Sequence, residues 1–309
     1  MSRILITGAN GFLGSRLAYL SLNCDDSNTV FGLYREKNHK TPKEAKPIVY
    51  LQCDINDLEG LKRIISDYEI EVVYHLAAQS IVRIANTNPL YCFQNNVIGT
   101  ANVLESVRQI NPKIKVVCAS SDKAYGEHEE LPYQEDFALK AGDPYSTSKA
   151  CGDLVAQSYA KTYGLNVNII RSANIYGPGD MNLSRIIPNT ILRIKKGQKP
   201  QIYSGVMDFV REFIYVDDVC SAYQIAAHAG VYGQSFNVGT SHVFKVSDLI
   251  GKICVMMGWN EGIEVIDKSF HEITTQYLTS AKIELLYGWE PKTDINEGLK
   301  KTIAWYLAR

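Results

Sequence analysis

The sequence has no long apolar run. None of its apolar segments approaches the roughly 18 residues that a membrane-spanning helix needs, so no transmembrane segment is expected. The first residues, Met1 to Arg3, lead directly into a short strand-like run and lack the apolar core and small-residue cleavage site of a secretory signal. We therefore expect a cytoplasmic protein.

An excess of charge of either sign is also missing. The chain carries 32 Lys and Arg residues against 33 Asp and Glu, a net charge of −1, so neither nucleic acid nor a membrane surface is an expected partner. The seven cysteines are scattered and form no C-x-x-C pair, which predicts reduced thiols and no metal site. An anionic ligand must then be bound by local groups.

What the sequence does contain is an alternation of strand-like and helical patterns. With 309 residues and 46% hydrophobic content, the chain can form one large α/β domain or two domains around a cleft. The alternation predicts a Rossmann-type doubly wound parallel sheet with a smaller C-terminal α/β domain. The strand-like runs lie at 4–6, 29–33, 49–51, 72–76, 114–118 and 167–170, and a polar, proline-containing stretch at 38–47 is a predicted surface loop.

A glycine-rich turn follows the first strand. Gly8, Gly11 and Gly14, with Phe12 and Leu13 between the last two, lie between the strand-like run and an amphipathic helical pattern. Their spacing permits a tight turn and a close backbone approach, so that a pyrophosphate can bind at the helix N-terminus. Such a triplet also occurs in ordinary strand-to-helix turns, but its position favours a dinucleotide site.

Two positions lie where such folds contact the adenosine half of a cofactor. Arg35 follows the second strand and can accommodate a 2′-phosphate, which favours NADP slightly over NAD; the alternative is a solvated loop charge. Asp54 and Ile55 follow the third strand. Asp54 can hydrogen-bond an adenine amino group or cap the helix that begins near Asp57, and both readings stay open.

The fourth strand delivers small residues to the same edge of the sheet. These residues are Leu76, Ala77, Ala78 and Gln79. Small side chains there let a flat cofactor approach. His75 lies inside the apolar run and is predicted to be a core histidine rather than a catalyst. One long helical pattern at 89–110 places Asn95, Asn96 and Thr100 on adjacent turns facing the cleft.

Two polar clusters can assemble a redox site. Their candidate members are Ser121, Asp122, Lys123, Tyr145 and Lys149. The first three follow the strand at 114–118, at the edge where open α/β sheets bind ligands. Tyr145 and Lys149 lie one turn apart on a helical pattern at 145–162, so the lysine can lower the pKa of the tyrosine. The alternative for the first cluster is that Asp122 caps a turn and Lys123 points into water.

Six motifs occur in an order that is typical of one family. They are the glycine turn, Asp54-Ile55, His75-Leu76-Ala77-Ala78-Gln79, Tyr145-x-x-x-Lys149, the stretch Arg-x-x-Asn-x-Tyr-Gly-Pro-Gly at 171–179, and Arg211-Glu212-Phe213-Ile214-Tyr215-Val216. Over nearly its whole length the chain resembles the extended short-chain dehydrogenase/reductases that act on nucleotide sugars. Its Ser121-Asp122-Lys123 is similar to the motif of CDP-glucose 4,6-dehydratases.

The resemblance implies dehydration through a transient oxidation. Ionised Tyr145, with Ser121 on the same oxygen, would take the hydroxyl proton at carbon 4 while hydride moves to NAD(P). Lys123 would then remove the proton at carbon 5, and Asp122 would protonate the departing hydroxyl at carbon 6. This role requires neutral Lys123, which burial and nearby Lys149 would favour. A 4-epimerase, a carbon-4 oxidoreductase and a non-catalytic dinucleotide-binding protein remain alternatives.

The resemblance also points to residues for the nucleotide sugar. Asn174, Arg185 and Arg211 would bind it, with Arg211 as a fork for the pyrophosphate, although each can instead be a surface or interdomain residue. Many relatives carry an Arg-Tyr pair where this chain has Gln276-Tyr277, which removes one expected phosphate contact. The nucleotide base and the sugar therefore stay open.

The pattern along the chain predicts the domain organisation, and the resemblance implies the assembly. A dinucleotide-binding domain would comprise 1–175 and 209–240, with the strand from Val210 returning to its sheet. A nucleotide-sugar-binding domain would comprise 176–208 and 241–309. The helices from Pro89 and from Tyr145 would pair with a second copy in a four-helix bundle, so a homodimer is expected.

Overall fold

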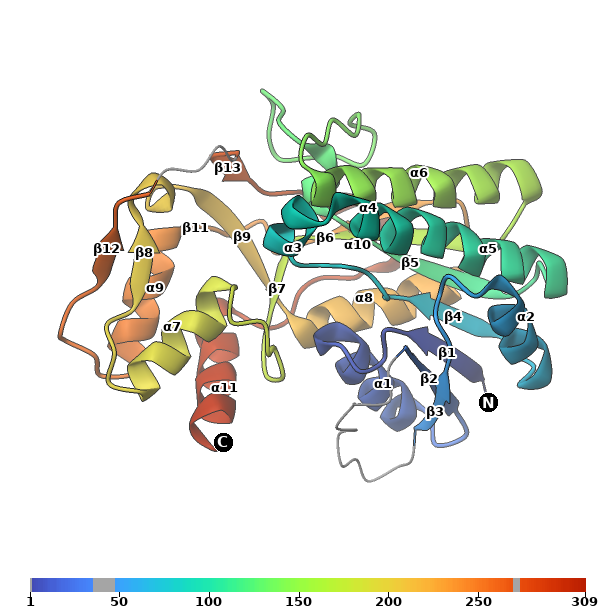
Figure 1. The fold of residues 1–309 in the computed structure, drawn as a ribbon, viewed down its shortest axis with the longest axis horizontal. Coiled ribbons are helices and arrows are strands. Elements are labelled where there is room, and N and C mark those ends of the chain that lie inside the picture. The colour runs from blue at the N-terminus through green and yellow to red at the C-terminus, as the bar shows by residue number, and fades with distance from the viewer. Residues whose placement is uncertain (1, 36–47, 269–272) are drawn as a thin grey trace.

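A parallel sheet of seven strands forms the centre of the molecule (Figure 1). The computed structural model describes residues 2–35, 48–268 and 273–309, so the predicted loop at 38–47 lies outside the described residues. The strand order is β10-β6-β5-β4-β1-β2-β3. The strands are β1 (Arg3–Thr7), β2 (Thr29–Tyr34), β3 (Val49–Gln52), β4 (Val72–His75), β5 (Lys115–Ser121), β6 (Val167–Ser172) and β10 (Ser235–Val238). The predicted Rossmann-type fold is confirmed.

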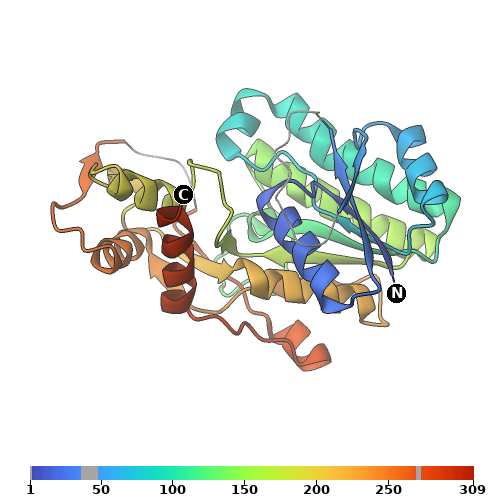
Figure 2. The same ribbon diagram turned by 90° about the horizontal axis from the view of Figure 1, so that it is seen from below.

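Helices cover both faces of this sheet (Figures 1 and 2). Every residue of β4 and β6 is buried, as expected for strands that lie between two helical layers. One layer contains α2 (Leu58–Asp67), α5 (Gly99–Ile110) and α6 (Pro144–Tyr163), and the other contains α1 (Phe12–Cys24) and α8 (Val216–His228). The strand order reverses between β1 and β4, which is where such sheets bind their ligands.

The single helix predicted at 89–110 is interrupted. Its residues form α4 (Pro89–Phe93), a π-helical turn η1 (Gln94–Ile98) and then α5. Pro89 stands at the start of α4, where its missing N–H is no loss, and Asn88 caps that start by accepting from the Tyr91 N–H. A short helix α3 (Val82–Thr87), which the sequence did not predict, precedes it. The π-turn changes the directions in which Asn95 and Asn96 point, as described below.

A second lobe holds the remaining strands. Its sheet pairs β9 (Val210–Tyr215) with β7 (Asn174–Tyr176), β11 (Val243–Lys245) and β13 (Thr275–Gln276). The prediction that the strand from Val210 returns to the central sheet is therefore wrong. Its backbone is paired within the second lobe, and the chain rejoins the central sheet only through α8 and β10.

The second lobe is completed by a parallel strand pair and three helices. These elements are β8 (Gln201–Tyr203) with β12 (Glu264–Ile266), and α7 (Ile186–Lys195), α9 (Val246–Met256) and α11 (Ile295–Leu307). Helix α10 (Ala281–Tyr287) packs instead beside β10 of the central sheet. Among the helices in the described part of the chain, none combines the length and the apolar character needed to cross a bilayer.

A buried polar network lies beneath the carboxyl edge of the sheet. Arg171 on β6 donates to Asp153 on α6 at 2.8 Å and to the Tyr125 hydroxyl at 2.9 Å. Tyr125 in turn donates to Asn237 on β10 at 2.7 Å. Buried charged groups fix the positions of the side chains that pair with them, because each buried donor must keep its acceptor. The network anchors the end of the 3₁₀ turn η2 (Asp122–Tyr125), which carries two candidate catalytic side chains.

Candidate active site

One cleft of about 1250 Å³ lies between the central sheet and the second lobe. All the residues predicted to be catalytic, cofactor-binding or substrate-binding line it. They are Gly8, Gly11, Phe12, Leu13, Gly14, Arg35, Asp54, Ile55, Leu76, Ala77, Ala78, Gln79, Ser121, Asp122, Lys123, Tyr145, Lys149, Asn174, Arg185 and Arg211. The structure therefore brings together groups that are up to about two hundred positions apart in the chain.

The glycine turn fits a dinucleotide. Gly8 has a φ of 71°, and the Gly11 N–H donates to the Gly8 carbonyl at 2.9 Å, which closes the turn. A Cβ on Gly14 would lie 2.1 Å from the Gly8 oxygen, so the packing of helix on turn requires glycine. Gly11 is the N-cap of α1 and makes no side-chain cap bond. The N-terminus of α1 is thus open toward an anionic ligand.

The two adenosine-side candidates have local partners. The Arg35 guanidinium donates to the Tyr91 hydroxyl and lies 5.7 Å from the centre of that ring. Asp54 accepts from the backbone and side-chain N–H groups of Asn56, at 2.9 and 3.0 Å. The cap of α2 is Asp57, which accepts from the Gly60 N–H, so the alternative reading of Asp54 as that cap is wrong.

Hydrogen bonds join Ser121, Asp122 and Lys123, and Tyr145 lies beside them. The Ser121 side chain lowers the pKa of Tyr145. Ser121 Oγ donates to Asp122 Oδ1 at 2.9 Å and accepts from the Lys123 N–H at 3.3 Å. Ser121 therefore caps η2, and Asp122 does not. The side chains of Ser121 and Tyr145 meet at the point where a substrate hydroxyl would need both.

Asp122 has an incompletely satisfied carboxylate. The residue is 2% exposed, and its Oδ2 has no hydrogen-bond partner among the residues that the structure describes. Buried carboxylate oxygens are almost always hydrogen-bonded in folded proteins. Asp122 also lines the cleft, so its carboxylate lies beside the space that a ligand would occupy. Lys123, half-buried beside it, also lines the cleft, so the alternative of a water-facing lysine is not supported.

The pKa values of the tyrosine and the lysine are both shifted by burial. Burial raises the pKa of Tyr145 to about 12, against the Arg185 charge and the Ser121 side chain, which both lower it. The Lys149 ammonium donates to the Ala119 carbonyl at 2.9 Å, and burial lowers its own pKa to about 8. That Lys149 lowers the pKa of Tyr145 stays a prediction.

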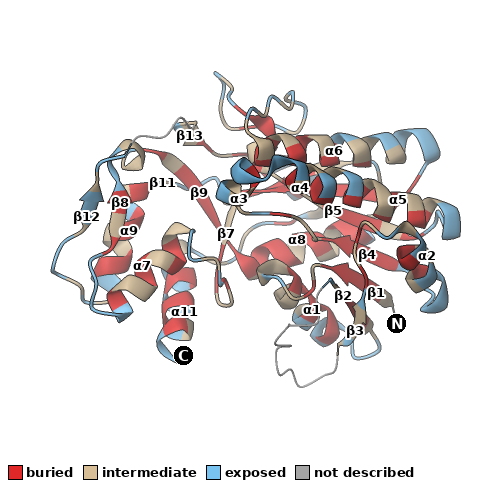
Figure 3. Cartoon of the chain, in the orientation of Figure 1, coloured by how far each residue is buried: buried red, intermediate tan, exposed pale blue. Residues whose placement is uncertain are grey.

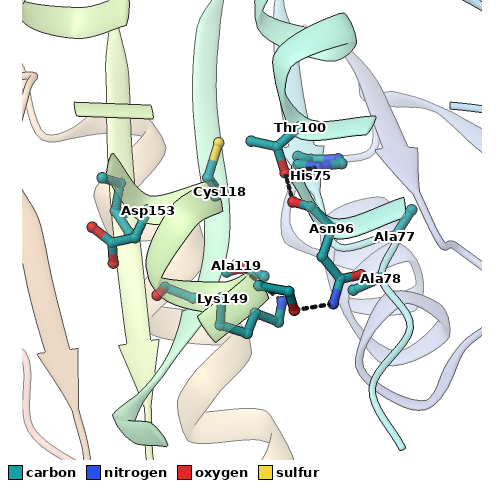
Figure 4. A pocket seen from close by; sticks show the side chains of 13 residues that line it. His75, Ala77, Ala78, Asn96, Thr100, Cys118, Ala119, Lys149 and Asp153 are labelled. Atoms are coloured by element: carbon teal, nitrogen blue, oxygen red, sulfur yellow. Dashed lines mark hydrogen bonds between the residues drawn. The ribbon is translucent and has the colours of Figure 1, made fainter. Parts of the chain in front are cut away.

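Behind Lys149 lies a small closed cavity of about 10 Å³, enough for roughly one water molecule. Figure 4 shows Lys149, Asn96, Thr100 and His75 around it. His75 is buried between the hydroxyls of Thr7 and Thr100, at 2.9 and 3.0 Å, and burial lowers its pKa to about 3. His75 is therefore a neutral core histidine, as predicted.

The sequence predicted that Asn95 and Asn96 both face the cleft, but in the π-helical turn η1 their side chains have different surroundings. Asn95 lines the large cleft. Asn96 is buried, and its amide donates to the Gln79 carbonyl at 2.9 Å and to the Ser148 hydroxyl at 2.8 Å. Asn96 thus fixes the backbone that follows β4, and Thr100 on the next turn supports His75.

The predicted substrate residues already have protein partners. Asn174 donates to the Glu212 carbonyl at 3.0 Å. Arg185 pairs with Asp180 at 3.0 Å and lies 5.9 Å from the Phe12 ring, so it spans from the second lobe to the glycine turn. Arg211 donates to the carbonyls of Val210, Ile273 and Thr274. These contacts hold the groups at the cleft wall.

Sequence reasoning missed several cleft residues. Tyr91 meets Arg35, and Tyr203 lies 5.5 Å from the Lys268 ammonium across the far end of the cleft. Gln276, read only as a lost phosphate contact, accepts from Lys123 at 3.4 Å. No motif or spacing in the sequence marks these residues, because each is brought to its place by the packing of distant segments.

The central sheet is doubly wound, carries a glycine turn after β1, and has Ser121, Tyr145 and Lys149 at its carboxyl edge. These features define an extended short-chain dehydrogenase/reductase. The family model described as GDP-mannose 4,6 dehydratase matches residues 5–302. The chain belongs to this family, whose known members among its relatives are nucleotide-sugar 4,6-dehydratases and 4-epimerases.

Both kinds of enzyme are similar to this chain. The dTDP-glucose 4,6-dehydratase 1 of Escherichia coli is 29% identical, covering 99% of this chain and 93% of that protein. A putative UDP-glucose 4-epimerase of Methanocaldococcus jannaschii is 33% identical, covering 98% and 97%. Among solved structures, the dTDP-glucose 4,6-dehydratase of Bacillus anthracis in complex with NAD has a TM-score of 0.90 at 28% identity, covering 100% of this chain and 97% of that one.

Some relatives are much longer. The chain spans 46% of a trifunctional UDP-glucose 4,6-dehydratase, epimerase and reductase of Arabidopsis thaliana, to which it is 29% identical over 98% of its own length.

Proposed function

We propose that this protein is an NDP-hexose 4,6-dehydratase, which forms an NDP-4-keto-6-deoxyhexose. The observation that supports this most is the pair Asp122 and Lys123 beside the Ser121 and Tyr145 hydroxyls. A buried carboxylate oxygen without a partner and a half-buried amine line the same wall of the cleft. Oxidation at carbon 4 needs only the serine and tyrosine. An additional acid and base are what the elimination of water requires.

Four side chains of the cleft have different roles in the proposed reaction. A bound NAD(P) would supply the hydride acceptor at carbon 4 and the hydride donor at carbon 6. Tyr145 Oη takes the proton of the carbon-4 hydroxyl, and Ser121 Oγ hydrogen-bonds the same oxygen. Lys123 Nζ removes the proton at carbon 5, and the protonated Asp122 carboxyl gives its proton to the carbon-6 hydroxyl, which leaves as water. Lys123 then returns its proton to carbon 5.

A 4-epimerase or carbon-4 oxidoreductase is the second candidate. It is favoured by the relatives: a UDP-glucose 4-epimerase of Thermotoga maritima has a TM-score of 0.91 at 28% identity and covers 98% of both chains. Such an enzyme would use Ser121 and Tyr145 in the same way but would have no need of Asp122 and Lys123. The two candidate functions therefore differ in whether Asp122 and Lys123, both on η2, take part in the reaction.

Incubation of the purified protein with CDP-, dTDP-, UDP- and GDP-hexoses, followed by mass spectrometry, tests the proposal. We expect one of these nucleotide sugars to lose the mass of one water without added reductant. A new isomer of unchanged mass would contradict the dehydratase and support the epimerase. The nucleotide released from the protein by acid, identified in the same spectrometer, distinguishes NAD from NADP; we propose NADP, bound at its 2′-phosphate by Arg35.

We also propose that the protein is a homodimer. Helices α4 and α6 have exposed residues on their outer side (Figure 3). Among the large apolar residues on these helices and the adjoining η1, Leu90 on α4 is 75% exposed, Ile98 on η1 51% and Leu154 on α6 53%. A second copy that packs the same helices against these would cover them.

Sedimentation at micromolar concentrations should therefore give twice the monomer mass, and Leu154→Arg should give the monomer. The matched control is Leu285→Arg, at an 86% exposed position on α10, which should leave the dimer intact. A wild-type protein that sediments at the monomer mass throughout would contradict the proposal.

A further inference from the structure

Gln276 contacts the proposed base from the other lobe of the molecule. Its side-chain oxygen accepts from Lys123 Nζ at 3.4 Å, across 153 positions of sequence. Gln276 lies on β13, at the register position of Arg211 on β9, and is 2% exposed. Such a buried amide needs partners for both its oxygen and its nitrogen. The contact with Lys123 satisfies the oxygen.

Buried groups surround this amide. Tyr133 lies beside Gln276, which lowers the pKa of the Tyr133 hydroxyl, and that hydroxyl donates to the Gly126 carbonyl at 2.6 Å. Tyr133 is fully buried and stacks on Tyr125 at 4.8 Å, so this neighbour of Gln276 is held by the core.

The strand that carries Gln276 is also fixed. The buried carboxylate of Glu212 on β9 accepts from the backbone N–H groups of Leu278, at 3.0 Å, Ser241, at 2.6 Å, and Thr240. Arg211 donates to the carbonyls just before β13. Gln276 is therefore held on the same strand pair that places Arg211 in the cleft wall.

From these contacts we infer that Gln276 is a positioning residue for Lys123, and this inference rests on the proposed dehydratase function. A neutral amide can hold the amine of Lys123 in place in its charged and its neutral form. A carboxylate at the same position would favour the charged form. Glutamine thus orients the base at carbon 5 without holding the proton on it, and it does not act on the oxidation at carbon 4.

The test compares Gln276→Met and Gln276→Glu in the full chain, with the nucleotide sugar that the wild-type protein dehydrates. A misplacement of about 1 Å costs on the order of 10²-fold in rate. We expect Gln276→Met to lower kcat for water loss by roughly 10- to 100-fold with KM nearly unchanged. For Gln276→Glu we expect the rise of kcat with pH to move to higher pH. Carbon-4 oxidation, measured as reduced nicotinamide formed in a single turnover, should be retained in both.

The matched controls are Gln198→Met and Gln198→Glu, at an exposed position outside the cleft, which should behave like the wild type. Wild-type rates and pH profiles in both Gln276 variants would overturn the inference. A parallel loss of oxidation and water loss would also overturn it, because it would indicate a general structural role. A wild-type protein that dehydrates no nucleotide sugar would instead contradict the proposed function itself, before any variant is made.

Discussion

Lys123→Met should lower the rate of water loss by roughly 10²- to 10⁴-fold, the usual contribution of a general base. Methionine keeps much of the length of the side chain but has no group that can accept the carbon-5 proton. Oxidation at carbon 4 should continue, because Ser121 and Tyr145 are unchanged. The first half of the reaction would then stop at the 4-ketone. Single-turnover formation of reduced nicotinamide, together with the mass of the nucleotide sugar, measures the two steps separately.

Lys113→Met is the control for this change, since Lys113 is exposed and does not line the cleft. It should retain both steps at wild-type rates. If Lys123→Met leaves the overall turnover of the natural substrate within about threefold of the wild type, Lys123 is not the base, and the epimerase becomes the better assignment.

Tyr145→Phe should abolish both steps, with a fall of roughly 10²- to 10⁴-fold in carbon-4 oxidation. The hydroxyl of Tyr145 is the only part of the side chain that the change removes. The neighbouring Ser121 stays in place, because its hydroxyl is bonded to Asp122. Loss of oxidation without loss of cofactor or nucleotide-sugar binding would identify Tyr145 as the group that takes the carbon-4 proton. Equilibrium binding and single-turnover kinetics provide the two measurements.

The ionisation of Tyr145, measured in the wild type and compared with the same variant, gives a second readout. Burial raises the pKa of Tyr145 to about 12 in the absence of ligands, so the phenol is protonated at neutral pH. A cation bound beside it favours the phenolate and lowers this pKa. Ultraviolet titration of the cofactor-bound wild type should show one tyrosine that ionises below the pH of the others, and Tyr145→Phe should lack it. Tyr68→Phe, at a 37% exposed position outside the cleft, should keep it.

The parts of the site that depend on neighbours in the chain were predictable. The glycine turn can be recognised because a positive φ at Gly8 and the absence of space at Gly14 are demands that only glycine meets. Tyr145 and Lys149 both line the cleft because a four-residue spacing on a helix places two side chains on one face. Strand ends in a parallel sheet meet at one edge, so Ser121 could be placed beside them.

The partners of these residues were not predictable in the same way. The bond from the Lys149 ammonium to the Ala119 carbonyl, and the Arg185 charge from the other lobe that lowers the pKa of Tyr145, could not be read from the sequence. The strand from Val210 was expected in the central sheet because its apolar pattern fits any buried strand. Its actual pairing depends on β7, β11 and β13, which are distant in sequence.

By itself, the sequence determined the doubly wound fold, the dinucleotide turn and the identity of the groups that can move protons, since periodicity, glycine geometry and side-chain chemistry are local properties. Only the tertiary structure decided which of these groups meet. The contact of Gln276 with Lys123, across 153 positions, depends on how the two lobes pack. Packing fixes distances between residues far apart in the chain, and no spacing within the sequence encodes those distances.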